Sequence, residues 1–187
     1  MTLDLERELR ERGAILDGHF RLSSGRHSDR FIQKFRILED PKLVEPVARA
    51  IADAFAGAGP TVVLSAAVGG IILGYEVARA LNVKAIFAEK EAGAPVLRRG
   101  FHLDPADRAL VVEDVITTGG SVREVLGIVR AARATVVGVG AIVRRGEADF
   151  GVPTVALLEM PIVSYDEHEC PQCKRGAPID DPGSRRR

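Results

Sequence analysis

The sequence predicts an α/β protein whose core is an open, mostly parallel sheet with helices on both faces, preceded by a small N-terminal element. Short apolar segments rich in β-branched residues alternate with segments of helical period. The apolar segments are continuous rather than alternating, which is typical of parallel strands covered on both faces. The chain has 187 residues, enough for one domain with a full core.

The N-terminal region predicts a short helix followed by a hairpin. Leu5 and Leu9 lie one turn apart among Glu and Arg residues at i,i+4 spacing, and Gly13 ends this helix. Residues 20–33, FRLSSGRHSDRFIQ, have no helical period. Apolar residues flank a polar stretch at residues 23–25, as in two strands joined by a turn.

The rest of the chain alternates between expected strands and helices. Pro41 opens a helix that ends in the breaker at residues 57–60. Strands are expected at 61–66, 84–88, 109–113, 135–142 and 154–158, helices at 71–81 and 119–133, and a turn at residues 69–70. Residues 89–108 show no convincing period and contain two glycines and two prolines. A connection of this length inside a compact domain predicts a functional lid.

Composition excludes several classes of protein. Hydrophobic residues make up 46% and charged residues 28%, as in globular proteins rather than disordered ones. The 26 basic and 26 acidic residues cancel, so no general attraction to nucleic acid or to anionic membranes is expected. No apolar run approaches the ~20 residues that span a bilayer, and the charged N-terminal segment is unlike a signal peptide. We therefore expect a cytoplasmic protein.

Two cysteines, Cys170 and Cys173, form a C-x-x-C pair with His168 nearby. Such a knuckle supplies half of a tetrahedral zinc site, so the pair is a weak zinc candidate, and a local turn with two reduced thiols is the alternative. The other histidines show no metal-ligand spacing along the sequence: His19, His27 and His102.

Residues 110–123, LVVEDVITTGGSVR, carry the strongest functional pattern. An apolar strand is expected to end in Glu113 and Asp114, and a turn of two threonines, two glycines and a serine leads into the next helix. Glycines let the backbone approach an anion, and the N–H groups at a helix start point toward it. The carboxylates can accept hydrogen bonds from a vicinal diol, so the pattern predicts a ribose 5-phosphate site. The alternative is an ordinary N-cap turn after a solvated strand end.

Other nucleotide signatures are missing. The sequence has no G-x-x-x-x-G-K-[ST], and Gly138 and Gly140 fall inside an expected strand without the third glycine of G-x-G-x-x-G. A P-loop protein or a dinucleotide-binding fold is therefore disfavoured.

The order of apolar strand, two acids, two apolar residues and TTGGS resembles the phosphoribosyl pyrophosphate (PRPP) motif of type I phosphoribosyltransferases. The segment FRLSSGRHS followed by Phe31 and Ile32 resembles the N-terminal hood of orotate phosphoribosyltransferases, and the similarity extends over about residues 15–160. The resemblance implies the type I phosphoribosyltransferase fold and a PRPP site, with Lys90 and Asp114 as catalytic candidates. The implied PRPP-binding residues are Lys90, Glu113, Asp114, Val115, Ile116, Thr117, Thr118, Gly119, Gly120 and Ser121.

The resemblance also implies an orotate site formed by Thr117, Arg145 and the backbone around Phe31 and Ile32. A guanidinium fork suits a carboxylate or a carbonyl edge, which agrees with the place given to Arg145. A solvated charge at a strand end is the alternative for this arginine.

The lid departs from the pattern of the family. Glu89 stands where many members carry arginine, and Gly93 and Pro95 take the places of a usual lysine and histidine. Arg98 and Arg99 are the substitute cations of this lid, or else solvated loop charges.

The reaction implied by the resemblance transfers the ribose 5-phosphate group from PRPP to orotate, giving orotidine 5′-monophosphate and pyrophosphate in pyrimidine biosynthesis. Mg²⁺ held mainly by PRPP, with no direct protein ligand, is the expected cofactor. A homodimer with composite sites is the expected assembly, with Lys90 reaching the partner's site. The alternatives are a phosphoribosyltransferase for another nucleobase and a non-enzymatic regulator that senses PRPP and binds nucleic acid. Zero net charge argues against the regulator.

We expect one phosphoribosyltransferase domain over residues 1–179. Its hood covers about residues 1–40, its core about 41–160 and its C-x-x-C segment 161–179, and residues 180–187 are expected to form a flexible tail.

Overall fold

The computed structural model describes residues 4–22 and 24–182. Two compact units form, the larger from residues 38–160 and the smaller from the described residues on either side of it, 4–22, 24–37 and 161–182. The C-terminal segment therefore folds with the N-terminal residues and not with the sheet of the larger unit. Among the described helices, none combines the length and the apolar character needed to cross a membrane.

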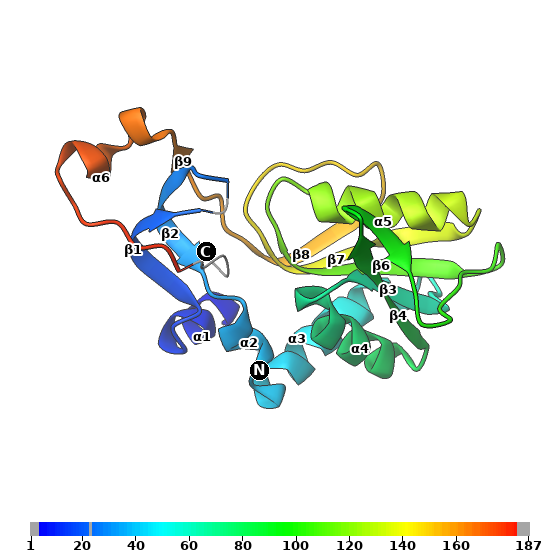
Figure 1. Ribbon diagram of the computed structural model, residues 1–187. Coiled ribbons are helices and arrows are strands. Elements are labelled where there is room, and N and C mark those ends of the chain that lie inside the picture. The colour runs from blue at the N-terminus through cyan, green and yellow to red at the C-terminus, as the bar shows by residue number, and fades with distance from the viewer. Residues whose placement is uncertain (1–3, 23, 183–187) are drawn as a thin grey trace. The chain divides into compact units, whose positions relative to one another are not determined.

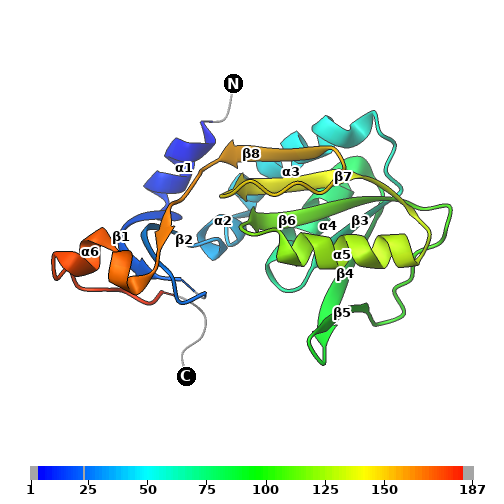
Figure 2. The same ribbon diagram turned by 90° about the horizontal axis from the view of Figure 1, so that it is seen from above.

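The larger unit is a six-stranded sheet in the order β5-β4-β3-β6-β7-β8, parallel except for β5. Helix α5 packs on one face, and α3 and α4 pack on the other (Figure 1). Figure 2 shows β5 and β8 at the two outer edges of this sheet. The strands are β3 (Val62–Ala66), β4 (Lys84–Glu91), β5 (Ala94–Leu97), β6 (Arg108–Ile116), β7 (Thr135–Arg144) and β8 (Thr154–Glu159), and the helices are α3 (Pro41–Ala56), α4 (Gly69–Leu81) and α5 (Gly120–Ala131).

The two glycines of β7 let α3 lie close to the sheet. A Cβ atom on Gly138 would overlap the ring of Phe55, and one on Gly140 would stand 2.5 Å from Ile51 Cγ2. Both positions are closer than van der Waals contact allows. These glycines therefore serve helix–sheet packing, in agreement with the sequence argument against a dinucleotide-binding motif.

Asp107 fastens the start of β6 to its neighbours. Its carboxylate accepts hydrogen bonds from the hydroxyl of Thr61 at 3.0 Å and the N–H of Asp104 at 2.9 Å, and Lys84 Nζ lies 3.2 Å away. Burial raises the pKa of the Asp107 carboxyl, but these hydrogen bonds and the lysine outweigh it and hold the pKa below its usual value. The carboxylate thus stays charged at the end of the sheet opposite the candidate site.

The smaller unit is an antiparallel sheet in the order β1-β2-β9 with short helices. The register of β1 shifts between Asp17 and Phe20, which is a bulge, and the neighbouring residues His19 and Phe20 are both buried as a result. The elements are α1 (Leu5–Glu11), β1 (Ile15–Arg21), β2 (His27–Ile32), α2 (Phe35–Leu38, which crosses into the larger unit), β9 (Ser164–Tyr165), the 3₁₀ helix η1 (Glu167–Glu169) and α6 (Pro171–Lys174).

The predicted sheet, the first helix, the hairpin and the helix from Pro41 are confirmed. Ser23, in the hairpin turn, lies outside the described residues. The expected turn at residues 69–70 is wrong, because Gly69 and Gly70 are the first residues of α4. Two short elements, α2 and β9, had no periodic signal in the sequence because they are four and two residues long.

The predicted structureless lid is also partly wrong. Its first half is a hairpin in which β4 continues to Glu91 and pairs with β5, with Ala92 and Gly93 in left-handed backbone at the turn. The predicted flexible tail is corrected at Asp180, whose N–H and carbonyl pair with the backbones of His19 and Arg21 at 2.8 Å each. Residues 183–187 of that tail lie outside the described part of the chain.

Candidate active site

A hollow of about 250 Å³ lies at the carboxyl end of β6, where the sheet passes into α5. Ligands of open α/β sheets bind at this end of the strands. The hollow contains all the predicted PRPP-binding residues except Asp114. Its lining residues are Lys90, Glu113, Val115, Ile116, Thr117, Thr118, Gly119, Gly120, Ser121, Val122 and Glu124.

Gly119 shapes the turn that forms the floor of this hollow. Its φ of +77° is left-handed, and a Cβ there would meet Phe150 at 2.7 Å and Ala148 at 3.0 Å. The next residue begins α5, a helix of 12 residues, so its first N–H groups have no partner within the helix and face outward. Arg123 stabilises the turn. Its guanidinium donates to the carbonyl oxygen of Thr118 at 2.6 Å and lies over the Phe150 ring. Residues 117–121 therefore form a rigid turn whose N–H groups can bind an anion, and we call this turn the anion cradle.

The acidic pair belongs to the strand itself. β6 runs on to Ile116, so the expectation that the strand ends at Glu113 and Asp114 is wrong, and both residues are buried rather than solvated. Glu113 Oε1 accepts from the Asp114 N–H at 3.1 Å, and Asp114 Oδ1 accepts from the Val115 N–H at 2.6 Å. Glu113 reaches the hollow, whereas Asp114 does not line it. These hydrogen bonds hold both carboxylates against the backbone of the strand.

Arg145 follows β7, the strand beside β6, and its N–H donates to the Ile116 carbonyl at 2.8 Å. This places the start of its side chain next to Thr117, which leaves β6 at the same level. The side chain is half-buried, and burial lowers the pKa of its guanidinium. Its Nε atom is buried without a hydrogen-bond partner among the described residues. A solvated strand-end charge does not have this environment, and a desolvated donor of this kind suits an anionic ligand.

Lys90 and the two lid arginines differ in position. Lys90 lines the hollow of its own chain, with Nζ 3.4 Å from Glu124 Oε2. Arg98 pairs with Glu91 at 3.4 Å, and Arg99 donates to Glu89. That hydrogen bond raises the pKa of Arg99. The structure thus brings Lys90 to the hollow. Arg98 and Arg99 follow β5, lie outside the lining and form ion pairs with two glutamates of β4.

Comparison with known proteins assigns the family. Residues 35–151 match the family model described as a phosphoribosyl transferase domain. The orotate phosphoribosyltransferase of Pelotomaculum thermopropionicum is 54% identical over 176 residues, which cover 93% of each chain. That of Chlorobaculum parvum is 51% identical over 175 residues, 92% of this chain and 91% of the relative. The chain belongs to the orotate phosphoribosyltransferase family.

The solved orotate phosphoribosyltransferase of Aeropyrum pernix has the same fold, with a TM-score of 0.70 and 28% identity over 83% of this chain and 93% of that one. The sequence interpretation of family and fold is therefore confirmed. The roles of individual residues of this chain stay predictions. Phe31 and Ile32 lie on β2 in the smaller unit, and their contact with orotate is among these predictions.

Several residues of the site were missed from the sequence. Val122 and Glu124 line the hollow one turn into α5, and Arg123 and Phe150 brace the cradle. Val122 and Glu124 could have been predicted from the helix expected at residues 119–133, because residues of the first turn lie near a ligand bound at the helix N-terminus. Phe150 lies in a loop after β7, and the sequence holds no local sign of its contact with Gly119.

The smaller unit contains a second cluster of chemically active side chains. His19 and His27, which show no metal-ligand spacing along the sequence, lie beside Cys170 and Cys173. Spacing along the sequence could not indicate this cluster, because the fold brings together residues about 150 positions apart.

Proposed function

We propose that the hollow at the end of β6 is the PRPP site at which this chain makes orotidine 5′-monophosphate from orotate. The observation that carries the proposal is the gathering of the predicted residues, except Asp114, around one anion cradle with fixed carboxylates beside it. The 5-phosphate would lie on the N–H groups and hydroxyls of residues 117–121. Glu113 would accept hydrogen bonds from the ribose diol, while the Asp114 carboxylate, which accepts from the Val115 N–H, would hold the backbone behind it.

The reaction is a displacement of pyrophosphate by a nitrogen of orotate at the anomeric carbon of PRPP, with oxocarbenium character in the transition state. It needs no protein nucleophile, so the side chains of the hollow would bind and orient the reactants and exclude water. Lys90, at the rim, would contact the leaving pyrophosphate and balance part of its charge. Carboxylates beside the ribose would favour positive charge on its ring.

Arg145 and Thr117 would hold orotate. They leave adjacent strands at the same level, and the guanidinium already has a desolvated donor. The orotate carboxylate or a ring carbonyl edge would accept from the guanidinium fork. The proposed contact to the backbone around Phe31 and Ile32 rests on the resemblance alone.

Mg²⁺ is the proposed cofactor. The donors around the hollow are carboxylates and hydroxyls, which are hard oxygen ligands, and Mg²⁺ commonly combines one or two such ligands with substrate phosphates and water. The site therefore fits an ion carried mainly by PRPP. When bound, the ion would neutralise the pyrophosphate oxygens.

A base panel tests the proposal against its nearest rival, a phosphoribosyltransferase for another base. The purified chain is assayed with PRPP, Mg²⁺ and, in turn, orotate, uracil, adenine, hypoxanthine or xanthine. Turnover with orotate and background rates with the others are expected. Preference for another base would refute the orotate assignment, and PRPP binding with no turnover of any base would favour the regulator.

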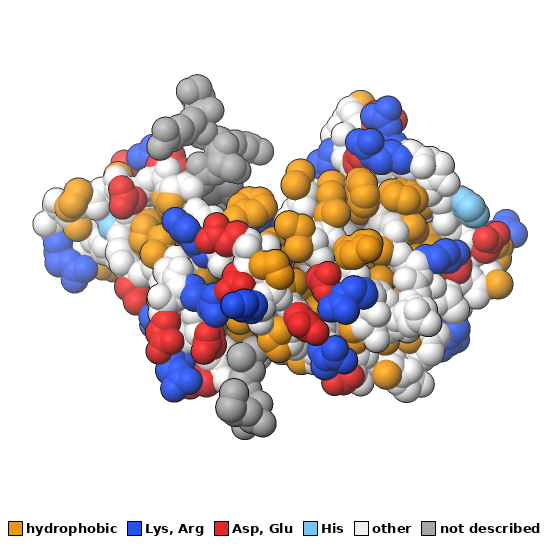
Figure 3. Space-filling view, turned by 90° about the horizontal axis from the view of Figure 1, so that it is seen from below, with side chains coloured by type: hydrophobic (Ala, Val, Ile, Leu, Met, Phe, Trp, Pro, Cys, Tyr) orange, Lys and Arg blue, Asp and Glu red, His pale blue; other side chains and the backbone are white. Residues whose placement is uncertain are grey.

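We propose a homodimer as the active assembly. Three apolar side chains at helical spacing are 45–71% exposed: Val68, the residue just before α4, and Ile72 and Tyr75 within the helix. Figure 3 shows hydrophobic side chains gathered on this face of the molecule. An exposed apolar stripe on a helix suits a second copy of the chain.

The composite site predicted for this dimer is tested by mixing subunits. After subunit exchange, a Lys90→Ala chain and an Asp114→Asn chain regain activity if Lys90 serves the partner's site. They stay inactive if both residues serve one chain's hollow. The contact of Lys90 with Glu124 of its own chain favours the second result.

A further inference from the structure

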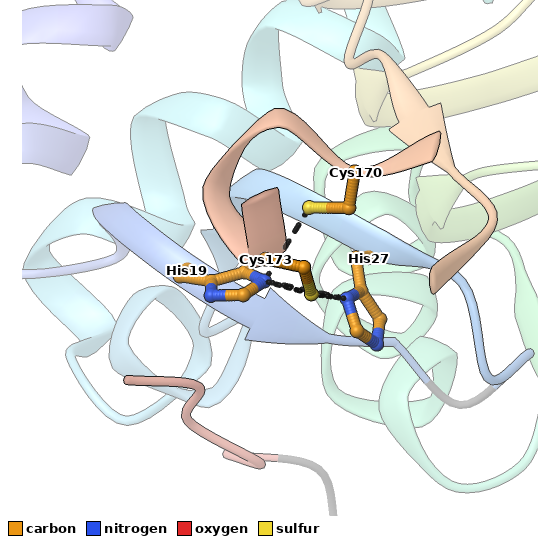
Figure 4. A group of neighbouring side chains, drawn as sticks. All are labelled: His19, His27, Cys170 and Cys173. Atoms are coloured by element: carbon orange, nitrogen blue, oxygen red, sulfur yellow. Dashed lines mark hydrogen bonds between the residues drawn. The ribbon is translucent and has the colours of Figure 1, made fainter. Parts of the chain in front are cut away.

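Four metal-binding side chains converge in the smaller unit, in a place with no role in the proposed reaction. His19 comes from the bulge of β1, His27 from β2, Cys170 from the residue before α6 and Cys173 from within α6 (Figure 4). Their facing atoms, one from each residue, all lie within 4.8 Å of one another. Three of the four residues are buried, and Cys173 is half-buried.

The distances between these atoms are those of a tetrahedral zinc site. With Zn–N near 2.0–2.1 Å and Zn–S near 2.3 Å, the edges of the tetrahedron are about 3.3–3.4 Å for N···N and about 3.6 Å for N···S. His19 Nε2 lies 3.3 Å from His27 Nδ1, 3.5 Å from Cys170 Sγ and 3.6 Å from Cys173 Sγ. His27 Nδ1 lies 3.1 Å from Cys173 Sγ. Four of the six distances between these atoms are thus close to the edges of such a tetrahedron, and all six are at most 4.8 Å.

The surroundings orient the two imidazoles for this role. His19 Nδ1 lies 3.1 Å from the carbonyl oxygen of Ala177, which can only accept, so Nδ1 carries the proton and Nε2 presents its lone pair to the cluster. His27 is 2% exposed, and its far nitrogen, Nε2, has no partner among the described residues. The ring is therefore held by packing, with Nδ1 directed at Cys173 Sγ.

A redox-active thiol pair is the competing interpretation of a C-x-x-C motif. Reactive thiols of that kind are partially exposed, whereas buried cysteines are inert. Cys170 is only 1% exposed. A redox-active dithiol also does not require the two histidines, which lie at metal-coordination distance from the sulfur atoms.

We propose that His19, His27, Cys170 and Cys173 form a Cys₂His₂ site for one structural Zn²⁺ ion. Two sulfur and two nitrogen ligands in a closed tetrahedron are the preference of zinc, and four protein ligands leave no open position for catalysis. The ion would fasten the C-terminal segment to the N-terminal hairpin, beside the backbone pairing of Asp180 with His19 and Arg21. A unit with so small a core gains stability from such a cross-link.

Metal analysis of the full chain tests the site. Chain purified without chelator and then dialysed is expected to hold one zinc per chain by mass spectrometry of the metal. Exchange with Co²⁺ is expected to give the thiolate charge-transfer and tetrahedral d–d absorption bands. Absence of zinc together with failure to bind added Zn²⁺ or Co²⁺ would overturn the proposal, and so would Co²⁺ spectra without thiolate bands.

Variants separate this cluster from adventitious binding. Cys173→Ser and His27→Gln should each lower zinc affinity by more than about 100-fold, the upper value for changes behind a ligand. His168→Asn is the matched control, because His168 is exposed and lies two residues before Cys170; it should keep one zinc per chain. Equal zinc content in all three variants would contradict the assignment. Co²⁺ spectra of the unaltered chain decide the question if a variant fails to fold.

The proposed structural role predicts a protease effect that is independent of the transferase reaction. Lys174 and Arg175 are exposed trypsin sites within the metal-held segment. Removal of zinc with a chelator should speed cleavage there at least about tenfold, and added Zn²⁺ should restore protection. Equal cleavage rates with and without zinc would show that the ion does not fasten this segment.

Discussion

Replacing Arg145 with alanine should weaken orotate binding and leave PRPP binding and folding intact. The guanidinium is half-buried, and its Nε has no hydrogen-bond partner among the described residues. The hydrogen bond that fastens the loop, from the Arg145 N–H to the Ile116 carbonyl, belongs to the backbone and survives in alanine. The side chain therefore contributes little to the fold and is available to the ligand.

The size of the effect follows from the bond that is lost. A hydrogen bond to a charged group is worth about 1.5–3 kcal/mol, which corresponds to about a 10- to 150-fold rise in the KM for orotate. Arginine stays charged at any pH of the assay even though burial lowers its pKa. Arg145→Lys should recover part of the loss, because lysine keeps the charge but lacks the planar fork.

Steady-state kinetics with each substrate varied in turn measure this effect. Arg144→Ala is the matched control, because the neighbouring arginine pairs with Glu159 at 2.9 Å and both side chains are partly exposed. Exposed pairs contribute about 0–1 kcal/mol, so this variant should show near-normal KM values. Equal rises in both KM values for Arg145→Ala, or a lower melting temperature, would refute the reasoning, since either would mean a structural role.

Three further predictions concern the cradle, the assembly and the sheet. Gly119→Ala, forced against Phe150 at positive φ, should lower the free energy of unfolding by about 2–4 kcal/mol in urea and weaken PRPP binding; unchanged stability would contradict the packing argument. Ile72→Asp should shift the sedimenting species to a monomer, whereas Val163→Asp, also exposed but away from α4, should not. The lowered pKa of Asp107 means that its contribution to stability is present above the usual value of about 3.9 and is lost as pH falls through the folded value. Asp107→Asn should therefore reduce the acid dependence of unfolding, and an unaltered dependence would exclude this carboxyl as its source.

The cradle was predictable because its signal is local. The acids at 113 and 114, the glycines at 119 and 120 and the helix that follows are contiguous in sequence, and each has a physical use that depends on near neighbours. The strand limits were less predictable. β6 continues beyond the acids to Ile116 because β7 pairs with it that far, which the sequence of one strand does not reveal.

The features that could not be predicted depend on long-range contact. Phe150 reaches Gly119 from another loop, and Arg99 reaches Glu89 across a hairpin. The metal cluster is the clearest case, because His19 and Cys170 are separated by 151 residues. The C-x-x-C pair supplies two of the four zinc ligands and is visible in the sequence. The two histidines of the β1–β2 hairpin join it only when the C-terminal segment packs against that hairpin.

A crystal structure of the chain with PRPP and Mg²⁺ measures the central claim most directly, because it locates each group of the substrate. The account predicts the 5-phosphate on the N–H groups of residues 118–121, the ribose diol at Glu113 and the pyrophosphate toward Lys90. PRPP in the reverse orientation, with its pyrophosphate in the cradle, or bound away from the end of β6, would contradict the account.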